Sequence, residues 1–336
     1  MTLAPPLLRH LRRLTDAGGV YEHALLAVPR PEHGYCVDDV ARALVVVCRS
    51  TEPPQETVDL RADYLAFLLA AQSGDGRFLN RRSSDQTWQG EPSVEDCWGR
   101  GLWGLGVAVS TTHEPALRDL TLTAFERGAA WRSPWSRALA FAALGASDVL
   151  TVYPENACAR ALLADAAARI SAPIESGWLW PEPRLTYANA VLPEVLLAAG
   201  AAFQVPALVD HGLALLEFLL ERQTVDGHLS VVPVGGWGPE DRPPGFDQQP
   251  IEVAHLADAC ARAHDVTGDD RWLDALELAV SWFFGANDSA TSLYDPDSGG
   301  GCDGLERDGR NENQGAESTL ALISTLQQAQ RLRQVT

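Results

Sequence analysis

Apolar residues recur with a helical period along nearly the whole chain, while the alternating pattern that predicts strands is nearly absent. Some stretches are rich in Ala and Leu and carry polar residues on one face, which predicts amphipathic helices. These stretches are residues 3–16, 56–72, 114–130, 154–170, 206–223 and 269–285. Others carry little charge beyond their first turn, which predicts helices buried on nearly all sides. The buried stretches are residues 38–49, 95–110, 134–146, 188–203, 249–263 and 314–329.

Buried and amphipathic helices therefore alternate, and this internal repeat predicts six helical hairpins. Six such hairpins close into an (α/α)6 toroid, with the opening helix paired to the last buried one. Two similar turns support the repeat, "QSGDGRF" at 72–78 and "QTVDGHL" at 223–229. In both, a Gly after Asp allows the left-handed turn that ends a helix. No stretch resembles a linker, so we expect an all-α fold in one domain, residues 1–336.

The charge of the chain limits its partners. All 26 basic residues are Arg, against 45 acidic residues, and the formal net charge is −19. Such a protein repels phosphate backbones and anionic lipids, so we expect neither nucleic acid nor membrane as a partner. A neutral substrate is compatible with this charge. The start of the chain lacks the apolar core of a signal peptide, and we expect a cytoplasmic protein.

Metal and cofactor signals are weak. The six cysteines lack the spacing of zinc ligands or of a disulfide framework, which predicts reduced, structural thiols. Glu252 and His255 form a single ExxH motif, whereas a di-iron bundle needs two. "GLWGLG" at 101–106 follows no strand and is no dinucleotide fingerprint, so its glycines indicate close helix packing. We expect no metal and no cofactor.

Each buried helix opens with a polar cluster. The clusters are "VDDVAR" (37–42), "SVEDCWGR" (93–100), "SPWSR" (133–137), "LTYANAVLPE" (185–194), "GFDQQPIEVAH" (245–255) and "NENQGAES" (311–318). Asp and Asn at such positions often cap the helix, and capping alone would explain any single cluster. In a toroid, however, the buried helices all start at one mouth, where the clusters would converge with several Trp and Tyr rings. Carboxylates, amides and flat rings around one opening suit a carbohydrate.

Cleavage of a glycosidic bond needs two carboxyl groups, one protonated and one ionised. We expect Asp38 to cap its helix and to pair with Arg42, which leaves Asp39 as the inward group. Asp96 is similarly spaced from Arg100. The candidates for the base or nucleophile are therefore Asp39 and Asp96. The candidates for the acid, with no basic neighbour except a histidine, are Glu252 and Glu317.

The remaining polar and aromatic residues of the clusters are expected to bind the substrate. They are Tyr35, Asp38, Arg42, Glu95, Trp98, Arg100, Trp103, Tyr187, Asn189, Trp237, Gln248, Gln249, His255, Asn313 and Gln314.

Five motifs also carry a family resemblance: "HGYCVDDVARAL", "EDCWGRGLWGLG", "TYANAVLPEVLLAAG", "GFDQQPIEVAHLADAC" and "NENQGAESTLALISTL". Together they resemble an uncharacterised bacterial family often labelled glycosyltransferase, whose members occur alone, fused to glycosyltransferase domains, or encoded near mannoside phosphorylases. The resemblance implies an (α/α)6 domain similar to those of inverting glycoside hydrolases and sugar epimerases, and it points to mannose-containing glycans. The chain itself has no Rossmann unit for a nucleotide sugar.

Three functions stay open. The first is a cofactor-independent glycoside hydrolase acting on an oligosaccharide. The second is a non-catalytic glycan-binding or partner module of a glycosyltransferase. The third is a terpenoid cyclase or prenyltransferase, whose toroids also carry Q-x-x-x-G repeats, although neither DDxxD nor DxDD occurs here. The sequence leaves open the sugar, its linkage, the stereochemistry and the oligomeric state.

Overall fold

A computed structural model describes residues 8–51, 54–170 and 178–333 of the chain. The helices that open with a polar cluster are α2 (Val37–Arg49), α4 (Asp96–Thr111), α6 (Ser136–Val152), α8 (Val191–Phe203), α10 (Pro250–Thr267) and α12 (Ala316–Arg333). The helices that alternate with them are α3 (Pro54–Ala71), α5 (Pro115–Ala129), α7 (Ala157–Ile170), α9 (Pro206–Gln223) and α11 (Arg271–Phe283). The alternation predicted from periodicity is confirmed.

The opening helix is shorter than predicted. Helix α1 covers Arg9–Arg13, because the chain then turns into a hairpin of β1 (Thr15–Asp16) and β2 (Gly19–Val20). Residues 3–7 of the predicted helix lie outside the described residues. The other strands are also short: β3 (Ala24–Leu25), β4 (Val28–Pro29), β5 (Tyr35–Cys36), β6 (Arg81–Arg82), β7 (Trp88–Gln89), β8 (Thr224–Val225), β9 (His228–Leu229), β10 (Gly304–Glu306) and β11 (Gly309–Asn311).

Both predicted turns contain the expected backbone conformation. Gly76 in "QSGDGRF" has φ +96° and Gly227 in "QTVDGHL" has φ +85°, which only glycine adopts without strain. The second turn forms the β8–β9 hairpin directly after α9. The helices themselves end earlier, at Ala71 and Gln223, so these glycines reverse the chain after the helix and do not cap it.

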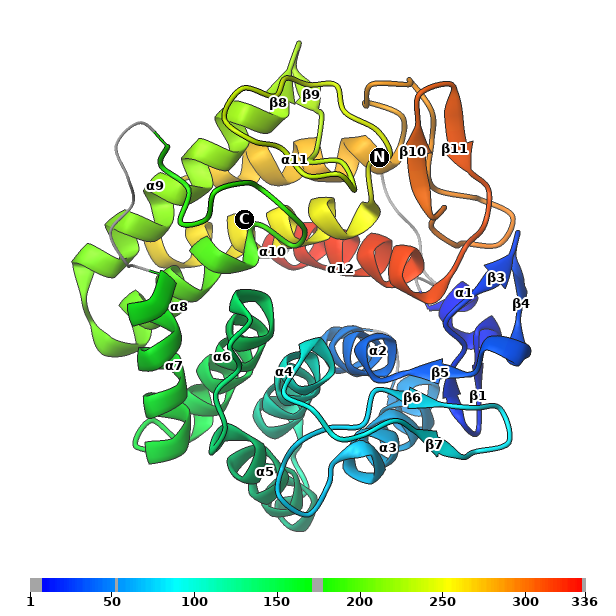
Figure 1. The fold of residues 1–336 in the computed structure, drawn as a ribbon, viewed down its shortest axis with the longest axis vertical. Helices are drawn as coiled ribbons and strands as arrows, with labels where there is room; N and C mark the ends of the chain where they lie inside the picture. Colours follow the sequence, from blue (N-terminus) through cyan, green and yellow to red (C-terminus); the bar gives the residue numbers. More distant parts are fainter. Residues whose placement is uncertain (1–7, 52–53, 171–177, 334–336) are drawn as a thin grey trace. The chain divides into compact units, whose positions relative to one another are not determined.

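Residue contacts divide the chain into two compact units. The first unit comprises the described parts of residues 1–24 and 28–168, and the second those of residues 25–27 and 169–336. In the first unit, α4 lies between α2 and α6, while α3 packs on α2 and α5 packs on α4 (Figure 1). Among the described residues, each helix is too short or too polar to cross a lipid bilayer.

Glycines bring the backbones of α4 and α6 into direct contact. A Cβ atom added at Gly99 would collide with the backbone of Ala138, and one added at Gly106 would collide with the backbone of Gly145. The two facing pairs have the same offset in sequence, so α4 and α6 run parallel. Helix α2 is parallel to α4 as well. Asp38 of α2 lies beside Arg100 of α4, and one turn further along both helices Ala41 lies beside Gly104. All three helices therefore start at the same end of the first unit.

In the second unit, polar side-chain contacts join α10 to α12 and α8 to α10. Asp258 of α10 accepts a hydrogen bond from Gln328 of α12 at 2.6 Å, and two turns later Asp265 pairs with Arg331 at 2.9 Å. Glu194 of α8 pairs in the same way with Arg262 of α10 at 3.1 Å.

A hairpin tip from the start of the chain also belongs to the second unit. The Leu26 N–H donates to Asn313 Oδ1 at 2.9 Å, and the Gln314 N–H donates to the Leu26 carbonyl at 3.0 Å. These bonds fix the segment that leads into α12.

The Gly106→Ala variant should lower the free energy of unfolding by about 1–3 kcal/mol, because its methyl group pushes α4 away from α6. The measurement is a denaturant titration followed by circular dichroism. Gly74→Ala is the matched control, since nothing lies within 4 Å of a Cβ atom there. Equal stabilities of the two variants would contradict the close packing of α4 on α6.

All six cysteines are free, as predicted, and burial raises the pKa of Cys260 to about 12. An unfolded thiol ionises near pH 8.5, so it loses its proton first as the pH rises. The contribution of Cys260 to stability should therefore be complete below about pH 8.5 and fall progressively toward pH 12. Cys260→Ala should flatten this alkaline loss of stability in denaturant titrations. An unchanged pH dependence would contradict the raised pKa.

Candidate functional site

The starting end of the first unit gathers two carboxylate–arginine pairs. Asp38 and Asp39 lie in the first turn of α2, and Arg100 reaches them from the first turns of α4. Arg42 follows one turn further along α2. Three of these four residues are at least nine-tenths buried, and burying a charge is costly unless it is paired. These two pairs therefore form the centre of the candidate site in the first unit.

Asp39 pairs with Arg42. The Arg42 Nη2 atom donates to Asp39 Oδ1 at 2.7 Å, and the Asp39 side chain is only 4% exposed. We expected Arg42 to pair with Asp38 and Asp39 to stay open. The structure shows the opposite, because the i,i+3 geometry brings Arg42 over Asp39 on the buried face of α2.

Asp38 faces α4. Its Oδ1 atom lies 3.6 Å from Arg100 Nε, and its Oδ2 atom accepts a weak hydrogen bond from the Cys36 thiol at 3.3 Å. Its side chain is 17% exposed. The expectation that Asp38 caps α2 is wrong, because Cys36 is the N-cap residue and makes no side-chain capping bond.

Arg100 is held by an aromatic ring. Its guanidinium carbon lies 4.1 Å from the centre of the Phe141 ring, which belongs to α6. The Arg100 side chain is 3% exposed, and its Nη1 atom has no hydrogen-bond partner among the described residues. Three parallel helices therefore contribute one side chain each to this stack: Asp38 from α2, Arg100 from α4 and Phe141 from α6.

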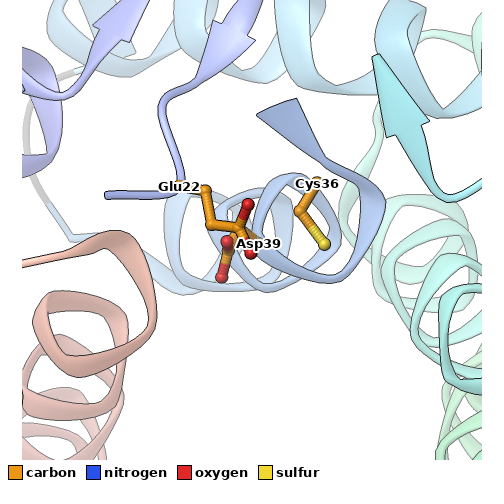
Figure 2. A group of neighbouring side chains, drawn as sticks. All are labelled: Glu22, Cys36 and Asp39. Atoms are coloured by element: carbon orange, nitrogen blue, oxygen red, sulfur yellow. The ribbon is translucent and has the colours of Figure 1, made fainter. Parts of the chain in front are cut away.

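Glu22, Cys36 and Asp39 form a cluster with the chemistry of metal ligands. Their nearest ligand atoms lie within 4.8 Å of one another, and Figure 2 shows the two carboxylates side by side next to the cysteine. Arg81 binds Glu22 through both Nη atoms, and Arg42 binds Asp39. Burial and the neighbouring carboxylates raise the pKa of the Cys36 thiol. Because both carboxylates are already neutralised and the thiol keeps its proton, the cluster fits a metal poorly.

Glu252 in the second unit is held by the segment before α8. It accepts hydrogen bonds from the Ala188 N–H, from the Asn189 N–H at 3.3 Å and from Asn189 Nδ2 at 2.9 Å. Glu252 is 4% exposed. Three donors hold the carboxylate in one orientation, which favours a structural or orienting role. Asn189, expected to bind the substrate, orients Glu252.

Buried polar residues continue along α10 beyond Glu252. They lie one turn apart and are His255, Asp258 and Arg262, of which the first two are 3% exposed. Asp258 also accepts a hydrogen bond from Ser324 of α12 at 3.3 Å. This stripe joins α10 to its neighbours inside the second unit.

Three predicted substrate ligands form structural hydrogen bonds instead. Gln248 is fully buried and donates to Asp288 at 2.6 Å. Asn313 binds the backbone of Leu26. Gln314 donates to Asp295 at 2.7 Å. Local sequence could not reveal these roles, because every partner lies far away in the chain or in another loop.

Several predicted stacking rings lie inside the protein. Trp98 is fully buried and donates from Nε1 to the Gly128 carbonyl at 3.0 Å. Trp103 is 4% exposed and packs near Arg49, at the opposite end of α2 from Asp38. Trp237 and Tyr35 are also buried. A buried ring has no open face for a sugar, so these four residues are not favoured as stacking residues.

Among the described residues, Tyr187, Trp131 and Trp135 have exposed rings. Tyr187 is 37% exposed in the second unit, and Trp131, in the first unit, donates from Nε1 to the Asp75 carbonyl at 2.7 Å. Trp135, which is not among the predicted ligands, is 60% exposed and is the N-cap residue of α6 at the starting end of the first unit. Its place in the "SPWSR" cluster was the available signal.

The remaining candidates lie at helix starts. Asp96 is the first residue of α4 and Glu317 the second of α12, and both are half-buried. Glu95 is exposed as the N-cap residue of α4, and Gln249 is the half-buried N-cap residue of α10. Asp96 is therefore the predicted catalytic residue that shares an end of the first unit with Asp38 and Asp39.

No protein-family model matches the chain, and no curated protein sequence matches it. Several solved structures, in contrast, match the chain. A sugar epimerase from a ruminal bacterium matches with a TM-score of 0.71 and 10% identity, over 96% of this chain and 95% of that one. The GH76 α-mannanase of Bacteroides thetaiotaomicron gives a TM-score of 0.67 and 11% identity, over 98% and 94%. The cellulase Cel9M of C. cellulolyticum, in complex with cellobiose, gives 0.67 and 9%, over 94% and 88%.

These similarities extend over nearly the full length of each chain, and at such low identity they establish the fold alone. The predicted fold class is confirmed: the protein is an all-α (α/α)6 toroid.

The Arg42→Ala variant should destabilise the protein by about 3–5 kcal/mol, because it removes the guanidinium group that pairs with the buried Asp39 carboxylate. Arg30→Ala is the matched control, since the Arg30–Glu32 pair is largely exposed and should contribute less than about 1 kcal/mol. Denaturant titration of both variants measures the difference. A loss below 1 kcal/mol for Arg42→Ala would contradict a buried structural pair.

Proposed function

We propose that this protein is a cofactor-independent glycoside hydrolase that acts on oligosaccharides. The observation that carries the proposal is the contact of the partly accessible Asp38 with Arg100 at the common start of α2 and α4, at the same end of the first unit as the exposed ring of Trp135. Carboxylates and arginine form directional hydrogen bonds with sugar hydroxyls, while a flat ring packs on the apolar face of a sugar.

The chemistry needs two carboxyl groups near the scissile bond. In the first unit, Asp38 and Asp96 start neighbouring parallel helices, and both are partly accessible. In the second unit, Glu317 is half-buried, whereas Glu252 is enclosed by three N–H donors. Within the first unit we therefore favour Asp96 as the partner of the α2 carboxylate, and within the second unit we favour Glu317 over Glu252 as a candidate carboxyl group. Mannose-containing oligosaccharides are the first substrates to test, because an α-mannanase shares the fold.

Sugar epimerisation is a second candidate. A sugar epimerase is among the structures with the same fold, and α10 carries the buried His255, a residue type that commonly transfers protons. Incubation with reducing disaccharides separates the two functions. An epimerase changes the sugar without releasing a new reducing end, whereas a hydrolase releases one.

The Asp96→Asn and Glu317→Gln variants should each lower turnover of the active oligosaccharide about 100-fold or more, the usual effect of losing a catalytic acid or base. Reducing-sugar release from mannan, glucan and arabinan fragments is the assay. Glu114→Gln is the control, because Glu114 is exposed beyond the far end of α4. Saturable binding without turnover in the wild type would instead indicate a glycan-binding module.

The Trp135→Ala variant should raise KM about 10-fold, because the ring would no longer pack on the sugar, a contact worth about 1 kcal/mol. Trp135→Phe keeps a flat ring and should retain most of the affinity. Initial rates over a range of substrate concentrations measure both. An unchanged KM in Trp135→Ala would remove this residue from the site.

A further inference from the structure

The two adjacent aspartates of α2 have opposite surroundings. Asp39 is 4% exposed, and its carboxylate is bound by Arg42 at 2.7 Å. It also lies against Glu22 and Cys36 (Figure 2). A carboxylate enclosed in this way has little capacity left for an external ligand. Asp39 is therefore a structural anchor of the starting end of α2.

Asp38 is bound more loosely and is more open. Its Oδ1 atom is buried against Arg100, so the exposed part of the carboxylate lies toward Oδ2. The donor to Oδ2 is the Cys36 thiol, which is a weak donor. Oδ2 thus keeps lone pairs for a sugar hydroxyl or a water molecule.

The packing of Phe141 holds the Arg100 side chain beside Asp38. The Phe141 ring covers one face of its guanidinium group, and the position of Phe141 depends on the close packing of α6 on α4. A buried guanidinium that is held by a ring orients Asp38 Oδ1 and keeps a positive charge beside the carboxylate.

We propose that Asp38, and not Asp39, is the carboxylate of the first unit that contacts the sugar, with Arg100 as its positioning residue. The proposal rests on the proposed action on oligosaccharides, and it gives the two aspartates separate roles. In this assignment Asp38 acts as a base or nucleophile, with the Arg100 guanidinium group beside it.

The test compares Asp38→Asn with Asp39→Asn in the full chain. Asp38→Asn should lower turnover at least 100-fold and should lower the melting temperature only modestly, since the Asp38–Arg100 contact, at 3.6 Å, is longer than the 2.7 Å bond of Asp39 to Arg42. Asp39→Asn should lower the melting temperature by more than that. Full turnover in Asp38→Asn, or an inactive but fully stable Asp39→Asn, would overturn the assignment.

Chemical rescue adds a readout that a structural role would not affect. Azide or formate should restore part of the turnover of Asp38→Ala, because a small anion replaces the missing carboxylate, and neither should rescue Asp39→Ala. Rescue of Asp39→Ala instead would reverse the two roles.

Arg100 is tested by separating kcat from KM. Arg100→Met should lower kcat at least tenfold and leave KM within twofold, and Arg100→Lys should recover part of kcat by restoring the charge. Unchanged kcat in Arg100→Met would remove its positioning role.

Calorimetry with the same oligosaccharides distinguishes a wrong residue from a wrong function. If the wild type binds a saccharide without turnover, the proposed hydrolase is wrong, yet at least tenfold weaker binding by Asp38→Ala would still support the contact. Equal dissociation constants for Asp38→Ala and the wild type would overturn the contact. Absence of saccharide binding by the wild type would overturn both.

Discussion

The close approach of α4 to α6 determines the geometry of the candidate site. Glycines at the facing positions allow the two backbones to touch, which fixes the register of the two helices. In that register, Phe141 of α6 lies against the guanidinium group of Arg100 on α4. Arg100 then meets Asp38 on α2. The backbone contact between α4 and α6 thus influences the orientation of the Asp38 carboxylate on α2.

The helices could be predicted from the sequence because their signal is local. The apolar period and the Gly-containing turns lie within single segments, and α9 covers Pro206–Gln223 as the pattern indicated. The short α1 shows the limit of this signal, since a hairpin directly after Arg13 replaced the last predicted turn. Burial of a helix could also be inferred from its low charge.

The roles of single polar and aromatic residues could not be predicted in this way. Consecutive residues on a helix point about 100° apart, so a small rotation of α2 decides whether Asp38 or Asp39 faces a neighbour. That rotation depends on Arg100, which lies on another helix. Trp98 likewise lies in a polar cluster, yet its ring is buried where its indole N–H meets the Gly128 carbonyl. Such partners are set by tertiary contacts.

The hairpin tip at Leu26 gives the fold a long-range connection. Leu26 and Asn313 are 287 positions apart in the sequence, and their hydrogen bond anchors the segment before α12. During synthesis, the tip leaves the ribosome long before its partner exists. The second unit can therefore complete its native contacts only when nearly the whole chain has been made, and its folding carries the entropic cost of closing a very large loop.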